Sequence, residues 1–319
     1  MGESLKVFSF SVEKDEIIDG VVKCSSCNEW YLIQERILEM LAPELNYTRR
    51  QKFYQDYSTR MKKMNILFEN SKIDNAASEA KKKQSEFFDS FSDHYVLETQ
   101  TFWRAYYART LQWFRTKITP NSLILDVGCG NALSSAPLLE GPYTVLGVDI
   151  SRGMVKDALK RLDDASSSAY FVADAEHLPF KNGIFDAAIG FGILHHVNEP
   201  EKVIDGISRC LKAGGYYFGH ENNKSIFRPL FDLSMKIFAL WHEEAGEHQL
   251  ISRGELRSIC DKHKLDLNVK TNVFLPVHFF NIFGVHVARV LLALSDAVFH
   301  AIPLLRHQGG TLVFQARKY

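Results

Sequence analysis

The sequence predicts an α/β protein: a doubly wound, seven-stranded, mostly parallel sheet with a small α+β appendage at the N-terminus and a helical cap. Three observations predict this class. Beyond Pro120, short β-rich runs alternate with helix-length segments. A glycine-rich turn follows the first of these runs. The 319 residues, 46% of them hydrophobic and 24% charged, have the composition of a globular protein of about two domains.

The N-terminal appendage is expected to comprise residues 1–46. Its apolar runs at 7–12 and 17–22 predict two short strands around a turn at Asp19-Gly20, and a helix is expected to follow them. Residues 47–86 are polar and basic with sparse apolar positions, which predicts a helical linker with a solvated surface.

A larger domain is expected over residues 87–319. Aromatic residues between 87 and 114 recur at spacings near three and four, which predicts one or two helices with a strongly apolar face. Strands are predicted at 123–127, 143–148, 170–173, 185–191 and 216–219, and then at 265–274 and 311–316.

The first strand runs directly into Gly128 and Gly130. Because glycine lacks Cβ, the backbone can turn sharply there and a ligand can approach the main chain closely. Asp149 ends the second strand, where a carboxylate can accept hydrogen bonds from a ribose diol. Leu133 replaces the third glycine of dinucleotide sites, and the carboxylate of Asp126 suits a cationic ligand better than a diphosphate. The charge pattern therefore favours S-adenosylmethionine.

Five motifs in chain order resemble those of the class I S-adenosylmethionine-dependent methyltransferases, from about residue 87 to the C-terminus. They lie at residues 126–130, 147–151, 173–180, 185–196 and 211–216. The resemblance implies a Rossmann-like fold, transferase activity and S-adenosylmethionine as the cofactor. It also implies these cofactor-binding residues: Asp126, Gly128 and Gly130 at the methionine end, Asp149 at the ribose, Ile150, Asp174 and Ala175 around the adenine, and Gly190 and Phe191 near the sulfonium.

Candidate catalytic residues follow the fourth and fifth strands. His195 and His196 lie where the family has its catalytic loop, and His220 begins a polar cluster that continues to Asn223. An imidazole there is suited to take a proton from a methyl acceptor, although both loop histidines could instead serve the loop's structure. His220, Glu221, His242, Glu243, Glu244 and His248 are metal-ligating types, but capping and polar binding explain them equally well, so we expect no metal.

The charge balance bears on the acceptor. Lys and Arg total 38, as do Asp and Glu, so the chain has no global positive field to attract nucleic acid. The loop at 190–196 also lacks the Asn-Pro-Pro-Tyr element of many base and amide methyltransferases. We therefore expect a small-molecule, sugar or lipid-like acceptor. The alternatives are a catalytically silent activator or scaffold subunit that binds S-adenosylmethionine, and an RNA methyltransferase that uses the basic residues of 49–63 and 81–83.

Residues 276–305 form an unusually long apolar and helical insertion between the sixth and seventh predicted strands. Together with residues 87–114, it is expected to cover the substrate side of the pocket. A homo-oligomeric contact, peripheral contact with a membrane surface and simple core packing are the other interpretations. Its five His, Arg and Asp residues argue against a transmembrane segment.

The cysteines carry two further expectations. Five cysteines, an odd number, fit a reducing compartment and hence the cytoplasm. Cys24 and Cys27 resemble one knuckle of a zinc ribbon, as found in the small modules that accompany or activate some methyltransferases. A structural zinc site needs four ligands, and the chain has no second Cys-x-x-Cys pair. We therefore expect a zinc-ribbon-like module without zinc.

Overall fold

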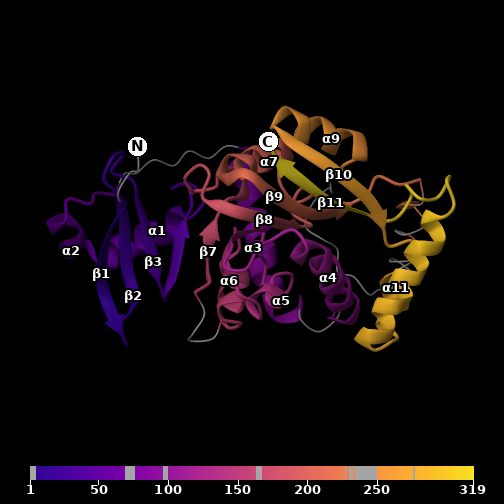
Figure 1. Cartoon of the computed structure of the whole chain (residues 1–319). Helices are drawn as coiled ribbons and strands as arrows, with labels where there is room; N and C mark the ends of the chain where they lie inside the picture. Colours follow the sequence, from indigo (N-terminus) through magenta and orange to yellow (C-terminus); the bar gives the residue numbers. More distant parts are fainter. Residues whose placement is uncertain are drawn as a thin grey trace.

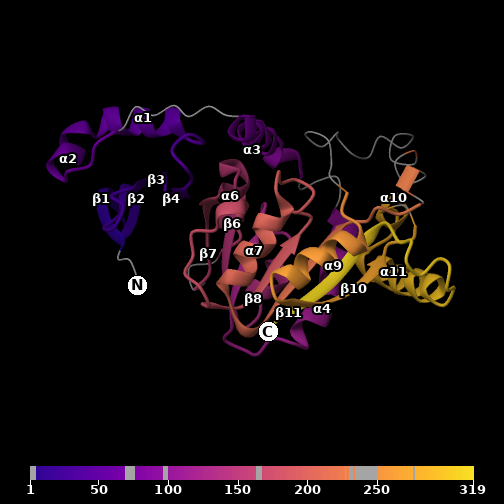
Figure 2. The same ribbon diagram turned by 90° about the horizontal axis from the view of Figure 1, so that it is seen from above.

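The computed structural model describes residues 5–68, 76–95, 100–162, 167–226, 228–229, 233, 250–275 and 277–319. The described strands form one continuous mixed sheet in the order β1-β2-β3-β4-β7-β6-β5-β8-β9-β11-β10. Helices pack on both of its faces, and the N-terminal strands and the helix α11 (Val285–His300) lie at opposite ends of the molecule (Figures 1 and 2).

The central part of the sheet has the predicted doubly wound order. Its strands are β5 (Leu123–Val127), β6 (Thr144–Asp149), β7 (Ala169–Ala173), β8 (Phe185–Phe191), β9 (Leu211–Asn222), β10 (Leu265–Asn272) and β11 (Thr311–Lys318). The pairs from β7 through β9 are parallel, and β11 and β10 add antiparallel. Parallel pairing aligns the carboxyl ends of β5, β6, β7 and β8 at one edge, which is where such sheets bind ligands.

Two apolar layers bury the faces of this sheet. On one face lie α4 (Gln100–Arg115), α5 (Ala136–Leu139) and α6 (Arg152–Leu159), whose side chains share a core with Ile124 and Ile189. On the other lie α7 (Pro200–Cys210) and α9 (Arg253–Lys262), which pack on Leu125 and Phe185. Because both faces are covered, the central strands are mostly apolar, as is usual for parallel strands.

The N-terminal region differs from its predicted secondary structure. The hairpin of β1 (Leu5–Glu13) and β2 (Glu16–Cys24) turns at Lys14 and Asp15, whose φ angles are 49° and 66°, and not at Asp19-Gly20. Gly20 instead pairs within the sheet, where a Cβ would lie 2.5 Å from the carbonyl oxygen of Phe8. The expected helix was also wrong: β3 (Trp30–Gln34) and β4 (Ile37–Met40) occupy that stretch, because short apolar runs do not distinguish strand from helix.

The N-terminal module, residues 5–68, has its own core. The helices α1 (Tyr47–Asp56) and α2 (Ser58–Lys63) contribute Phe53 and Met61, which pack with Trp30 and Leu32 of the sheet. The segment expected to be a linker therefore shares a core with the strands that precede it.

The module joins the central sheet through β4, which pairs in parallel with β7. At this junction the buried carboxylate of Glu39 accepts a 3.0 Å hydrogen bond from Arg152 Nε, and Arg152 also binds the carbonyl of Gln34 at 2.8 Å. Backbone pairing between β4 and β7 and the hydrogen bonds of Arg152 therefore attach the module to the central sheet.

The insertion between β10 and β11 contains α10 (Val277–Asn281) and α11, and both pack against α4. Ala288, Leu292 and Asp296 face inward, and Asp296 forms an ion pair with Arg109 of α4. None of the described helices is long and apolar enough to cross a membrane. The helix expected around residues 226–241, with the acids and histidines of 242–248, lies outside the described residues.

Candidate active site

A cleft opens at the carboxyl edge of β5, β6 and β8. Its floor is the glycine-rich loop after β5, and its walls come from α3 (Ala76–Tyr95) and α4. The large aromatic side chains on these walls are Phe88, Trp103 and Tyr107, and Phe191 at the end of β8 adds a fourth ring to the lining. The cleft therefore combines exposed backbone on one side with an aromatic surface on the other.

The glycine-rich loop is shaped by two residues with positive φ. Gly128, at φ 68°, has no room for a side chain, because a Cβ would lie 2.6 Å from Ile193. Gly130, at φ 51°, has open space at that position and lines the cleft. Its backbone N–H donates a 2.8 Å hydrogen bond to Asp149 Oδ2, so the acid that ends β6 fixes the loop after β5.

Two acids near this loop titrate abnormally. Asp149 lines the cleft and accepts a second backbone hydrogen bond, 2.9 Å from Ser151; burial nevertheless raises its pKa to about 6. Asp126 lies beneath the loop, 1% exposed, and burial raises its pKa to about 7. Its Oδ2, like the buried Nδ2 of Asn131 in the cleft lining, has no hydrogen-bond partner among the described residues.

The cleft continues along Ile150, Asp174 and Ala175 at the ends of β6 and β7. Asp174 accepts hydrogen bonds from Glu176 N at 3.0 Å, Lys81 Nζ at 2.6 Å and His177 Nδ1 at 2.9 Å. Burial alone would raise the pKa of Asp174, but the bonds from Lys81 and His177 lower it below its ordinary value.

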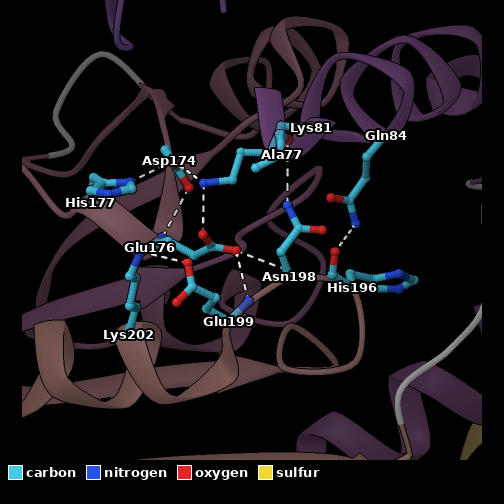
Figure 3. A network of polar contacts seen from close by, with 10 residues as sticks. All are labelled: Ala77, Lys81, Gln84, Asp174, Glu176, His177, His196, Asn198, Glu199 and Lys202. Carbon is cyan, nitrogen blue, oxygen red and sulfur yellow. Dashed lines mark hydrogen bonds and ion pairs between the residues drawn. The ribbon is translucent and has the colours of Figure 1, made fainter. Parts of the chain in front are cut away.

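Helix α3 is fastened over this side of the cleft by a polar network (Figure 3). Lys81 lies between Asp174 and Glu176, 2.7 Å from the second carboxylate. Gln84 donates to the carbonyl of His196, and Ser85 donates to the carbonyl of Ile150 at 3.1 Å. A separate helix thus closes the cleft through contacts with three loops of the sheet edge.

The same carboxylates belong to a cluster of side chains of metal-ligating type. Asp174, Glu176 and His177 are the only three ligand-type side chains within the described chain whose ligand atoms lie within 4.8 Å of one another. Lys81 already occupies the space between the two acids, so this group is better described as an ion-pair cluster. Cys24 is buried and Cys27 exposed, and the structure joins neither of them in a disulfide bond.

His195 is held by a buried glutamate. Its Nδ1 lies 2.7 Å from Glu221 Oε2, while Glu221 Oε1 accepts a 2.8 Å bond from the backbone N–H of Leu194. Asn222 Nδ2 lies 3.4 Å from the other ring nitrogen, Nε2. With Glu221 accepting from Nδ1–H, Nε2 is the basic nitrogen of the ring.

The three candidate histidines differ in their access to the cleft. His196 lines it, with its ring edge-on to Phe88 at 5.3 Å and 4.1 Å from the ring of His195. His195 lies one layer behind, against Gly192. His220 is stacked between Trp103 and Phe191, and burial lowers its pKa to about 3, so its imidazole is neutral.

The structure gathers most of the predicted site residues. Those that line the cleft are Gly128, Gly130, Asp149, Ile150, Asp174, Ala175, Phe191 and His196. Asp126, Gly190, His195 and His220 are absent from the lining, because each lies behind a residue that does line it or within the sheet.

Two features were not expected. Lys81 was counted among solvated basic residues, and Glu221 was named only as a metal-ligating type within the polar run after His220, not as the partner of His195. The expected cover is also different: α3 and α4 line the cleft, whereas no described residue of 276–305 does. The insertion lies on the outer side of α4, because the inward residues of α11 pack against that helix and Asp296 forms an ion pair with Arg109 of α4.

Known proteins resemble the central part of this chain in sequence. The family model described as "Methyltransferase domain" matches residues 125–219. A demethylmenaquinone methyltransferase of Renibacterium salmoninarum is 34% identical over 127 residues, which cover 38% of this chain and 52% of that protein. A ubiquinone biosynthesis O-methyltransferase of Idiomarina loihiensis is 28% identical over 163 residues, or 49% of this chain and 67% of that protein.

A tRNA (carboxymethyluridine(34)-5-O)-methyltransferase of Arabidopsis thaliana is 29% identical over 136 residues, which cover 40% of this chain and 32% of that protein. The chain therefore spans about half or less of the length of several of these relatives.

Among solved structures, a chain from the complex of the Haloferax volcanii Trm112 methyltransferase activator with its partner matches with a TM-score of 0.54 and 16% identity, over 73% of this chain and 96% of that one. An S-adenosylmethionine-dependent methyltransferase of Thermotoga maritima matches with a TM-score of 0.52 and 19% identity, over 73% of this chain and 99% of that one. Likeness at this level of identity concerns the fold.

Proposed function

We propose that the protein transfers a methyl group from S-adenosylmethionine to a small acceptor with a substantial apolar body, through the part of the chain, residues 125–219, that matches the methyltransferase-domain model. The observation that carries this proposal is the cleft itself. On one side Gly130, Asp149 and Ile150 form a surface suited to a nucleoside, and on the other side there is an aromatic wall. His196 also lines this cleft.

The residues on one side of the cleft suit the cofactor. Asp149 can accept hydrogen bonds from a ribose diol, and Ile150 offers an apolar contact for adenine. The unpaired Nδ2 of Asn131 is a buried donor in the cleft lining that the carboxylate of the amino acid end would satisfy. When bound, S-adenosylmethionine supplies an electrophilic methyl group.

The residues on the other side suit an apolar acceptor. Methyl transfer is a displacement that requires the acceptor atom to be held in line with the methyl carbon. Trp103, Tyr107 and Phe88 can hold a flat apolar body and exclude water from it. The similarity to a demethylmenaquinone methyltransferase and a ubiquinone biosynthesis O-methyltransferase supports an acceptor with an aromatic ring and a lipid-like tail.

His196 is the residue we assign to proton removal from the acceptor, since it is the histidine in the cleft lining. His195, clamped by Glu221, is then a positioning residue that fixes the loop beneath its neighbour. A positioned base contributes about 10² to 10⁴ in rate when the acceptor must lose a proton.

The test is release of S-adenosylhomocysteine in the presence of three probes: a demethylated menaquinol, a catechol and bulk tRNA. We expect turnover with the phenolic probes. His196→Ala should lower kcat by about 10² to 10⁴ with an unchanged cofactor Kd, and Asp149→Asn should instead raise the cofactor Kd by about tenfold or more. His263→Ala, on the far face of the sheet, is the matched histidine control.

Two outcomes would replace this proposal. Tight cofactor binding without turnover on any probe would favour the catalytically silent activator or scaffold. Turnover with tRNA alone would favour the RNA methyltransferase. Against the RNA alternative, Arg50 and Lys81 are buried and bind Glu29 and Asp174, so part of the expected phosphate track is already occupied.

A further inference from the structure

Helix α11 leaves a complete apolar face exposed. Its exposed positions recur at three- and four-residue spacing, and Val290, Leu294 and Val298 are 57%, 57% and 60% exposed. Alanines at 293, 297 and 301 are also exposed; the helix exposes no acidic side chain, and His286 is exposed in its first turn. Exposed large apolar residues continue beyond both helix ends at Ile282, Ile302 and Leu304. A contiguous surface of this kind marks an interaction site.

The opposite face of α11 explains why the exposed one is free. Ala288, Leu292 and Asp296 fill the contact with α4, and Asp296 is the single acid between residues 277 and 310. It is buried and paired with Arg109. The surface of this segment therefore carries no negative charge of its own.

Positive charge gathers beside the apolar face. A groove between α4, α5 and the start of α11 is lined by Arg104, Arg115, Arg161 and Arg289, against the single acid Glu140. None of these four arginines has an ion pair with an acid in the described part of the chain. Arg104 and Arg115 are exposed. A chain of zero net charge thus has a basic end where its apolar helix lies.

The groove adjoins the cofactor cleft, because Tyr107 and Leu133 line both. The basic groove therefore lies between the apolar face and the site of methyl transfer. In Figures 1 and 2, α11 stands at the outer end of the molecule, away from the N-terminal strands, so a flat partner can reach it.

We propose that the exposed face of α11 and the adjoining groove arginines dock the protein on the surface of a bilayer that contains anionic lipids. The valines and leucines would enter the boundary between headgroups and acyl chains, as in an interfacial amphipathic helix. Arg104, Arg115 and Arg289 would meet lipid phosphates, where each basic side chain strengthens binding by about fivefold. This inference goes beyond the proposed function, because docking requires neither cofactor nor acceptor.

The test is co-sedimentation of the full chain with vesicles of phosphatidylcholine, with and without phosphatidylglycerol. We expect binding to the mixed vesicles that weakens with salt. The triple variant Val290→Glu, Leu294→Glu, Val298→Glu should lower binding by at least about tenfold. The double variant Arg104→Gln, Arg289→Gln should lower it by about fivefold per arginine, and only on the anionic vesicles.

Control variants separate docking from loss of fold. Val7→Glu with Val12→Glu introduces charge at equally exposed valines, 55% and 56% exposed, in the strand at the other end of the molecule, and should leave vesicle binding unchanged. The α11 variants should keep the wild-type unfolding midpoint and cofactor Kd, since their side chains point to solvent.

Three results would overturn the proposal. The first is wild-type protein that fails to bind anionic vesicles. The second is a dimer that the α11 triple variant converts to monomer without any effect on vesicles, which would make the face a contact between copies. The third is binding of bulk tRNA, but not vesicles, that the arginine variants abolish.

Discussion

The central sheet carries two additions, one at each end, and they treat their apolar residues differently. The N-terminal module, residues 5–68, folds four strands and two helices around Phe53, Met61 and Trp30, which are at most 3% exposed. The insertion with α10 and α11 buries one face on α4 and leaves the other exposed.

The difference indicates two kinds of appendage. The module buries its apolar side chains in its own core. It then joins the central sheet through β4 and the buried Glu39, so it extends the folded body of the protein. The insertion is incomplete by itself, since an exposed apolar helix face is stable in water only at a cost. The proposed docking on a bilayer surface would cover this face.

The largest expected effect concerns the core of the module. Phe53→Ala removes a ring that is 1% exposed and should lower the free energy of unfolding by about 3 to 5 kcal/mol. Leu294→Ala on the exposed face of α11 should change it by less than about 0.5 kcal/mol. Urea denaturation measures both, and equal losses would contradict the contrast between the two additions.

The next largest effect concerns Asp126, in the centre of the sheet, which should make the free energy of unfolding depend on pH. Burial favours the neutral carboxyl of Asp126 in the folded state, since its pKa rises from 3.8 to about 7. Its contribution to stability is therefore complete below pH 4 and is lost as the pH rises through 7, by roughly 3 to 4 kcal/mol. Asp126→Asn should remove this loss, and an unchanged pH profile of unfolding would refute the assignment.

The junction of the module should be next in size. Arg152→Ala leaves the carboxylate of Glu39, 0% exposed, with Arg49 at 3.4 Å and Asn46 at 3.1 Å as remaining partners. We expect a loss of about 2 to 3 kcal/mol. Arg36→Ala breaks only exposed ion pairs and should cost less than about 1 kcal/mol. If Arg36→Ala lowered the free energy of unfolding as much as Arg152→Ala, the buried ion pair at the junction would contribute no more than the exposed pairs.

The anchor of the insertion should have a smaller effect. Asp296→Ala removes the partner of Arg109 and of the backbone N–H of Val273, 3.1 Å away. Because the Arg109 side chain is 32% exposed and can turn to water, we expect a loss of about 1 to 2 kcal/mol. Cofactor affinity should not change, which calorimetry can check, since no described residue of α11 lines the cleft.

Much of the candidate site could be predicted because it is local in sequence. The turn at Gly128 and Gly130, the acid that ends β6 and the histidine pair after β8 all lie directly at strand ends. In a parallel sheet these ends meet at one edge. Residues such as Lys81 could not be predicted, because Lys81 is separated from Asp174 by 93 residues and looks like its neighbours Lys82 and Lys83.

The N-terminal region illustrates the same limit for secondary structure. Its apolar runs are short enough to form either strand or helix, and the choice depends on what they pack against. Pairing of β2, β3 and β4 decides it, since each strand gains a neighbour that the sequence does not identify.

By itself, the sequence determined the doubly wound class, the glycine-rich loop and the apolar character of the insertion, because periodicity and strand-end motifs are local properties of the chain. Only the tertiary structure decided that α3 closes the cleft through Lys81, that Glu221 holds His195, and that α11 turns its apolar face outward. These features depend on contacts between distant segments, where burial, charge pairing and the space left by neighbours decide which side chains meet.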